Sequence, residues 1–401
     1  MITKLEIENF YSIKNRHDLD FTVPATTPTN DRYRFATDNS SVRTPTVLAI
    51  FGANASGKTS ILRAASFIRH FIIQSFDAYK PDQMVGIQAF ACHGNYSAPS
   101  TIAMEFTTSD GFDILGSSAA RYEVSISTDG RQSVVEHEAL LTIDDYGNAN
   151  RIFSRTMRKG EVRIKSSKEF ELGPSDPRRH VRNNVSLLSS LVQFNHGPSV
   201  KIVEAFRQSF FYNIDVGKVQ NTEAGVTKFL EDSPAFLKLL NGIIRRIDLG
   251  ITKVEIRNDG DGKLTPVFYH SGLDYPRTFH FESQGTQSFY LNFMDIFAAL
   301  TMGGVAIMDE LDADLHPNLM AEVINWFHSE IENPLGAQLF LTCHNASIIS
   351  DLDKEEVWLA EKNDFGETSV RGIKHFRGIR RDANLYSKYM AGEFGGVPRF
   401  G

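Results

Sequence analysis

The sequence has little cysteine and no long apolar run. Cysteine occurs only at Cys92 and Cys343 among 401 residues, so a disulfide framework is not expected and a reducing cytoplasm is. No stretch of 18 or more apolar residues suggests a transmembrane helix. The first eight residues, from Met1 to Glu8, alternate apolar and polar side chains and lack the apolar centre of a signal peptide. We therefore predict a cytoplasmic protein without membrane contact.

Internal repeats, long heptad runs and an overall basic charge are also missing. The first two absences argue against a solenoid and a coiled-coil arm. The net charge is −7, whereas proteins that coat nucleic acid are usually basic. One stretch differs, because Arg151 to Arg182 holds ten Lys/Arg against four Asp/Glu. It is either a solvated surface or a phosphate-binding one, and both interpretations stay open.

The apolar pattern that is present indicates a split α/β protein. Val47–Phe51 is a short apolar run typical of a buried parallel strand, and a helix is expected from Thr59 to Phe76. The segment Leu19–Val23 is expected to pair with the first strand. Short β-rich pieces such as Ser133–Ile143 then indicate an antiparallel sheet, and a helical region follows. Alternating strands and helices near the C-terminal end favour a parallel sheet, with a strand expected at Phe279–Phe281 and a short helix at Ala346–Asp351. We predict four segments: an N-terminal ATPase part at 1–84, a β-rich lobe at 85–182, a helical insertion at 183–250 and a C-terminal ATPase half at 251–401.

Gly52-Ala-Asn-Ala-Ser-Gly-Lys-Thr59 fits the phosphate-binding loop G-x-x-x-x-G-K-[ST]. Its glycines let the backbone curl until N–H groups point at phosphate, and the following helix adds its positive N-terminus. The lysine then reaches the β- and γ-phosphates, and the threonine hydroxyl ligates Mg²⁺. We expect ATP to contact Gly52, Asn54, Ser56, Gly57, Lys58, Thr59 and Ser60.

Two later strands end in polar residues that complete such a site. The apolar run Gly304–Met308 is followed by Asp309, expected to hold Mg²⁺, and by Glu310, expected to orient or deprotonate the attacking water. The strand Gln338–Thr342 is followed by His344, which we expect to touch the γ-phosphate. A surface turn and a structural histidine are the alternatives at these positions.

A third element, Glu282-Ser-Gln-Gly-Thr-Gln287, precedes a predicted helix. Ser283, the N–H groups near Gly285 and the helix N-terminus together make an anion site. A simple N-cap explains the same residues about as well.

Together these pieces resemble an ABC-type ATPase head of the SMC/RecF/OLD kind. Walker A, the signature, Walker B and the switch histidine correspond to Gly52–Thr59, Ser283–Thr286, Val305–Glu310 and His344. More closely, the chain is similar to the AAA15 or RloA/AbiL-like bacterial ATPases, some of which serve in phage defence. The narrower resemblance rests on residues 9–14, 283–287, 309–317, 341–345 and 389–398.

The resemblance implies a P-loop NTPase fold in which a β-rich and helical insertion divides the ABC-type head. It also implies a head-to-tail homo-oligomer, with Ser283 and Gly285 of one copy closing on the ATP of another. The signature lacks the transporter form, so only these two positions are carried over. No acidic nuclease cluster follows the ATPase half, so the chain is not expected to be a nuclease.

The function that the resemblance implies is an ATPase that acts as sensor or scaffold for a separate effector protein from the same operon, in anti-phage defence. The alternative is a RecF/SMC-like DNA-repair ATPase that binds DNA in an ATP-dependent way, with the Arg151–Arg182 stretch as its contact.

Overall fold

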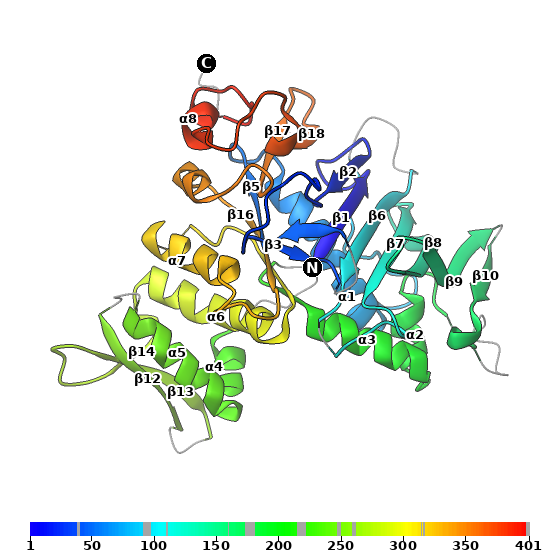
Figure 1. The fold of residues 1–401 in the computed structure, drawn as a ribbon. Helices are drawn as coiled ribbons and strands as arrows, with labels where there is room; N and C mark the ends of the chain where they lie inside the picture. Colours follow the sequence, from blue (N-terminus) through cyan, green and yellow to red (C-terminus); the bar gives the residue numbers. More distant parts are fainter. Residues whose placement is uncertain are drawn as a thin grey trace.

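The computed structural model describes residues 1–37, 41–90, 98–109, 111–158, 160–172, 181–214, 222–246, 250–258, 262–313, 315 and 317–397. Two large sheets and a smaller peripheral unit make up the molecule (Figure 1). Among the residues singled out above, those at positions 92, 159, 173–180, 314, 316 and 398 lie outside the described part.

The core is a six-stranded sheet in the order β11-β15-β16-β5-β17-β18. Its first five strands run parallel and the sixth is antiparallel. Every residue of β5, β15 and β16 is buried, as expected for strands covered on both faces. The strands are β5 (Val47–Phe51), β11 (Phe210–Tyr212), β15 (Val305–Met308), β16 (Gln338–Thr342), β17 (Val357–Lys362) and β18 (Thr368–Gly372).

Alternate residues of β5 face two different hydrophobic cores. Leu48 and Ile50 belong to the core that includes α1 (Lys58–Ala78). Val47, Ala49 and Phe51 belong to the core formed with α6 (Gln284–Met302) and α7 (Pro317–His328). The period of two along a strand thus places α1 on one face of the sheet and α6 with α7 on the other.

The second sheet is antiparallel and has seven strands, in the order β10-β9-β8-β7-β6-β1-β2. The structure confirms the predicted antiparallel β region and the pairing of the segment near Leu19 with the first strand. The strand at 149–158 was not predicted. One face packs against α1, α2 (Leu187–Val192) and α3 (Gly197–Ser209). The strands are β1 (Ile2–Glu8), β2 (His17–Asp20), β6 (Ser100–Thr107), β7 (Ala119–Thr128), β8 (Ser133–Ile143), β9 (Ala149–Arg158) and β10 (Glu161–Ser166).

The peripheral unit stands on the far side of the core from the antiparallel sheet (Figure 1). It joins the core through α6, where Tyr290 packs on Phe268 and Phe279 and its hydroxyl lies 3.0 Å from that of Thr227. Its elements are α4 (Glu223–Asp232), α5 (Pro234–Arg246), β12 (Ile251–Asn258), β13 (Leu264–His270) and β14 (Arg277–Thr278).

Short elements complete the chain. They are the hairpin β3 (Tyr33–Phe35) and β4 (Arg43–Pro45), the 3₁₀ turns η1 (Lys168–Phe170), η3 (Phe279–Phe281), η4 (Ala346–Asp351) and η5 (Ile373–His375), and α8 (Leu385–Met390). None of the helices in the described ranges is long and apolar enough to cross a membrane.

Three local predictions need correction. Phe279–Phe281 was expected as a strand, which would place both phenylalanines on one face; Phe279 is buried and Phe281 is 75% exposed, as a 3₁₀ turn allows. The short helix at Ala346–Asp351 is likewise 3₁₀. The segment 183–250 was expected to be helical, but β11 within it forms the edge of the core sheet.

Part of the basic stretch is structural. Arg155 is fully buried and lies 3.6 Å from the equally buried Glu138. It also donates hydrogen bonds to the carbonyls of Val185 and Arg182, at 2.7 and 2.8 Å. Because a buried charge needs a partner and satisfied hydrogen bonds, Arg155 belongs to the packing of β9 and is not available to phosphate.

Arg182 is also occupied. Its guanidinium lies 3.9 Å from the ring centroid of Phe76 and donates to the carbonyl of Tyr79 at 2.7 Å. These contacts tie the end of the basic stretch to the C-terminus of α1, where a cation interacts favourably with the helix dipole. Neither open interpretation of the stretch, a solvated surface or a phosphate-binding one, therefore describes Arg155 and Arg182, which make internal contacts.

Replacing Arg155 with Met should lower the free energy of unfolding by about 3–5 kcal/mol, because Glu138 then stays buried without its charged partner. Urea unfolding of the full chain, followed by circular dichroism, measures this loss. The exposed Arg163 on β10 is the control: R163M should change stability by no more than about 0.5 kcal/mol. Equal losses in the two variants would contradict a special role for the buried pair.

Candidate functional site

The phosphate loop, between β5 and α1, is packed too tightly for side chains at two glycines. A Cβ on Gly57, whose φ is 99°, would lie 2.2 Å from Thr368 Oγ1 and 2.6 Å from Ser12 Oγ. A Cβ on Gly52 would lie 2.2 Å from the carbonyl oxygen of Ala360. Both positions therefore require glycine, and the loop is held in place by β17, β18 and the turn after β1.

Lys58, the first residue of α1, bends back over its own loop. Its Nζ donates to the carbonyls of Gly52 and Ala53, at 2.9 and 3.1 Å. Burial lowers the pKa of Lys58, while the negative charges of Glu310 and Asp309 act in the opposite direction. The ammonium is thus positioned over the centre of the loop, where a phosphate group offers it stronger acceptors than these two carbonyls.

Asp309 lies where β15, β16 and α1 meet. Its Oδ1 accepts hydrogen bonds from Thr59 Oγ1 at 3.2 Å and from Thr342 Oγ1 at 2.6 Å. Hydroxyl and carboxylate oxygens are the ligands that Mg²⁺ prefers, and it usually takes few of them from protein and others from phosphate and water. The described residues contain no group of three His, Cys, Asp or Glu side chains that would hold a metal alone. The oxygen pair of Thr59 and Asp309 fits Mg²⁺ bound together with a nucleotide.

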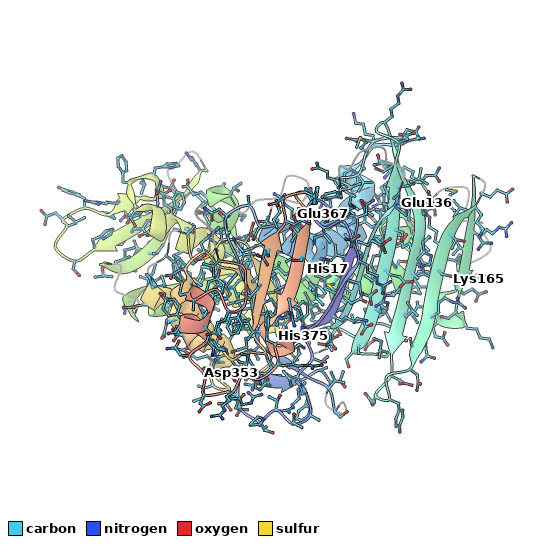
Figure 2. All side chains as sticks on the ribbon, turned by 90° about the horizontal axis from the view of Figure 1, so that it is seen from above. His17, Glu136, Lys165, Asp353, Glu367 and His375 are labelled. Atoms are coloured by element: carbon cyan, nitrogen blue, oxygen red, sulfur yellow. The ribbon has the colours of Figure 1, made fainter. Side chains whose placement is uncertain are left out.

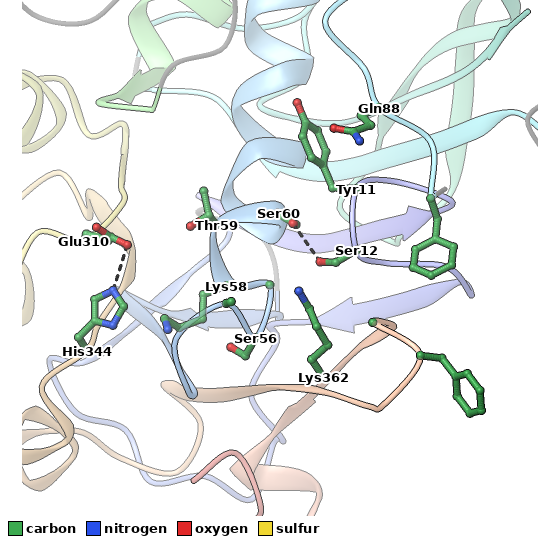
Figure 3. Close-up of a pocket in the computed structure, with 15 residues that line it drawn as sticks. Tyr11, Ser12, Ser56, Lys58, Thr59, Ser60, Gln88, Glu310, His344 and Lys362 are labelled. Atoms are coloured by element: carbon green, nitrogen blue, oxygen red, sulfur yellow. Dashed lines mark hydrogen bonds and ion pairs between the residues drawn. The ribbon is translucent and has the colours of Figure 1, made fainter. Parts of the chain in front are cut away.

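Glu310 and His344 form a pair across from the loop (Figure 3). His344 Nε2 lies 3.0 Å from Glu310 Oε1, and the Glu310 side chain is 54% exposed. The backbone of Glu310 has a φ of 50°, an uncommon conformation for a residue with a side chain. Its N–H donates to Thr342 Oγ1 at 2.8 Å, so the same threonine holds the Asp309 carboxylate and the Glu310 backbone after β15.

Asp312 supports this pair from behind. It is buried, and its Oδ2 accepts the backbone N–H groups of His344 at 2.8 Å and Asn345 at 2.6 Å. Its other oxygen, Oδ1, is buried without a hydrogen-bond partner. Asp312 was not among the predicted site residues, because only its position three residues after Asp309 indicated a role.

A cavity of about 510 Å³ lies between the phosphate loop and the Glu310–His344 pair (Figure 3). Seven predicted site residues line it: Ser56, Gly57, Lys58, Thr59, Ser60, Glu310 and His344. Residues that sequence analysis did not assign to the site line it too, namely Tyr11, Ser12, Ala55, Gln88, Phe90, Lys362, Phe365 and Gly366. Three of these are aromatic, and aromatic rings offer apolar surfaces on which a planar base can stack.

Comparison with known proteins identifies the family. Residues 47–350 match the family described as "AAA domain, putative AbiEii toxin, Type IV TA system". The chain belongs to this family. No match was found among curated proteins.

A solved SMC head shares the fold of this chain. A head bound to the C-winged helix domain of ScpA aligns with a TM-score of 0.53 and 15% identity, covering 92% of this chain and 97% of the other. The SMC head domain from Thermotoga maritima has a TM-score of 0.40 and 15% identity, covering 92% and 98%. The predicted fold class, an ABC-type P-loop head, is confirmed, and the family match identifies the chain as an AAA-type ATPase.

Not all predicted residues of the AbiEii-type chain come together. Gly52, Asn54 and Asp309 lie beside the cavity residues without lining it, whereas Ser283 and Gly285 lie on α6. Ser283 is the N-cap of α6, with Oγ accepting the N–H of Thr286 at 3.2 Å, and it is exposed. The N-cap interpretation is thus correct, and the contact of Ser283 with a nucleotide of another copy stays a prediction.

Replacing Asp312 with Leu should lower kcat about tenfold with little change in ATP affinity. The reason is that the His344–Asn345 backbone loses two hydrogen bonds to a charged acceptor, each worth roughly 1.5–3 kcal/mol. D312N is the matched control, since its carbonyl oxygen can still accept both N–H groups while its amide takes the place of the unpartnered Oδ1. Steady-state ATPase assays compare the two, and an unchanged kcat in D312L would contradict the supporting role.

Proposed function

We propose that this chain binds and hydrolyses ATP with Mg²⁺, and that two copies close head to tail over each nucleotide. The observation that carries the proposal is the cavity that the phosphate loop and the Glu310–His344 pair line together, with the Thr59–Asp309 oxygen pair beside it. Phosphoryl transfer needs little more than positioning and charge stabilisation, and these groups provide both.

Each residue has a role that follows from its place. The loop N–H groups, the N-terminus of α1 and the Lys58 ammonium hold the phosphates. Thr59 and Asp309 would hold Mg²⁺, which neutralises charge on the β- and γ-phosphates. Glu310, exposed to the cavity, orients a water molecule and accepts its proton. His344 contacts the γ-phosphate, and its hydrogen bond to Glu310 makes the position of the carboxylate depend on that contact.

A second copy supplies Ser283 and the N-terminus of its α6 to the nucleotide site, because these groups lie away from the cavity of their own chain. Ser283 and Gln284 are exposed at the N-terminus of α6, and a helix N-terminus is a natural anion site. They do not line the cavity of their own chain. A head-to-tail pair places the signature of each copy over the ATP of the other and buries both nucleotides, as the resemblance to ABC-type heads implies.

The biological role we propose is a sensor or scaffold that controls a separate effector protein in bacterial anti-phage defence. Its support is the resemblance to AAA15 or RloA/AbiL-like ATPases and the match to an AbiEii-type family. The test is co-purification with the product of the neighbouring gene, using the unaltered chain and E310Q. Absence of any partner, together with no phage phenotype in cells that express the operon, contradicts this role.

A DNA-repair role is the second candidate, and one observation favours it. Arg158, Arg163 and Lys165 are exposed, and the register of β9 with β10 places them on one face of the antiparallel sheet. Lys165 lies on the outermost strand, away from the core sheet (Figure 2). A basic edge of this kind suits a phosphate backbone.

Nucleotide turnover checks the ATPase mechanism. K58A should lose nucleotide binding, because the phosphates lose their main cation. E310Q should keep binding but lose hydrolysis and trap an ATP-bound dimer, visible by size-exclusion chromatography with light scattering. K228A, at an exposed lysine of α4, is the control and should behave as the unaltered chain does. Hydrolysis by E310Q at the normal rate would show that the role given to Glu310 is wrong.

Charge reversal checks the DNA alternative. Filter binding with duplex DNA should show ATP-dependent affinity with a steep salt dependence, and R163E with K165E should weaken it and reduce the salt slope by about 2, one unit for each lost phosphate contact. K228E on α4 serves as the control for net charge. No ATP-dependent affinity in the unaltered chain removes this alternative.

A further inference from the structure

Asn213 directly follows β11, the edge strand of the core sheet, and its side chain continues the hydrogen bonding of β11 with the β15 segment. Backbone pairing of β11 with β15 ends with the register Tyr212 to Ile307, followed by the Asn213 N–H on the Ile307 carbonyl at 3.2 Å. The Asn213 amide then takes over. Its Oδ1 accepts the N–H of Asp309 at 2.7 Å, and its Nδ2 donates to the Asp309 carbonyl at 3.2 Å. Both backbone groups of Asp309 are thus held by one side chain.

The same amide reaches the helix that begins at the signature. Asn213 Nδ2 donates a second hydrogen bond, 3.0 Å long, to Asn292 Oδ1 on α6. Asn292 is in turn anchored to its helix, since its Nδ2 donates to the carbonyl of Ser288 at 3.0 Å. From Asn292 the helix runs nine residues back to its N-cap, Ser283, a distance of about 13 Å.

This arrangement allows only one orientation of the Asn213 amide. Its oxygen faces a donor, and its nitrogen faces two acceptors, so both N–H bonds are used. Rotating the amide by half a turn would place oxygen against the Asp309 carbonyl and Asn292 Oδ1. Because the Asn213 amide is bonded to both Asn292 of α6 and the Asp309 backbone, we expect a shift of α6 to move the Asp309 backbone, and the reverse.

The orientation of the Asp309 carboxylate decides whether it can hold Mg²⁺ together with Thr59. The Asp309 peptide sets where Oδ1 points toward Thr59 and where the turn at Glu310 begins. The geometry points to Asn213 as a positioning residue that couples the signature helix, through Asn292, to the Mg²⁺ ligand Asp309. The inference deepens the proposed function and rests on it: a partner's nucleotide that engages Ser283 on α6 would change the affinity for Mg²⁺ in the site of the same chain.

The test uses the full chain, ATP and MgCl₂, and compares N292L with N292D. N292L is similar in size and removes the acceptor for Asn213, so the Mg²⁺ concentration for half-maximal hydrolysis should rise about fivefold, the equivalent of one lost hydrogen bond. ATP affinity measured without Mg²⁺ should stay within twofold. N292D keeps an acceptor oxygen and should restore most of the Mg²⁺ affinity. N213D, which loses both donors, should show at least the effect of N292L.

Asn241 provides a matched control for stability. Its amide clamps Val254 in the peripheral unit in the same way, accepting the Val254 N–H at 2.7 Å and donating to the Val254 carbonyl at 2.9 Å. N241D should therefore lower the melting temperature as N213D does, yet leave the Mg²⁺ dependence unchanged. A merely structural role for Asn213 predicts the same Mg²⁺ dependence in both.

Two results overturn the coupling. One is an unchanged Mg²⁺ requirement in N292L, and the other is an equal rise in N292L and N292D. If N213D does not fold, the Asn292 pair still decides the question. Failure of the proposed function itself looks different, because K58A would then hydrolyse ATP as fast as the unaltered chain whatever the Asn292 variants do.

Discussion

The position of Asp309 depends on side chains from three other parts of the chain. Thr59 at the start of α1 and Thr342 at the end of β16 donate to its carboxylate, and Asn213 after β11 holds its peptide. These residues span 283 positions and meet only because four parallel strands end at one edge of the core sheet. The crevice outside the carboxyl ends of parallel strands is where α/β sheets bind ligands. Any change in the order of these strands would separate the groups.

The phosphate loop depends on a second constraint, namely close packing from both ends of the chain. Ser12, in the turn after β1, and Thr368, at the start of β18, leave no room for a Cβ at Gly57. On the other side, Gly396 of the C-terminal segment lies beside Leu359 and Ala360 of β17. Tyr389 holds this segment together by donating to the carbonyl of Gly396 at 3.1 Å. Gly395 and Gly396 both have positive φ, which lets the chain turn beside Leu359 and Ala360. The terminal Gly-Gly element thus has a structural reason, because Ala360 is also the neighbour of Gly52.

The inserted segments are less separate from the ATPase core than their composition suggests. β11 lies in a segment of helical character, yet it is the edge strand beside β15 and carries Asn213. The basic stretch likewise divides into two kinds of residue. Arg155 and Arg182 hold β9 and α1 in place, whereas Arg158, Arg163 and Lys165 remain exposed. Net charge alone does not distinguish these two uses, because it contains no information on burial.

The sequence by itself determined the elements whose signal is local. Gly52–Thr59 follows an apolar strand and precedes an amphipathic helix, and β16 and β8 have the predicted limits, because hydrophobic period and loop chemistry act over a few residues. It also indicated Asp309, Glu310 and His344 as residues that follow buried strands. Tertiary structure alone decided that Asp312, Thr342, Asn213 and the aromatic lining residues of the cavity belong to the site. Each of these acts through a hydrogen bond or a packing contact with residues far away in the chain, and the pattern around a single residue does not record such a contact.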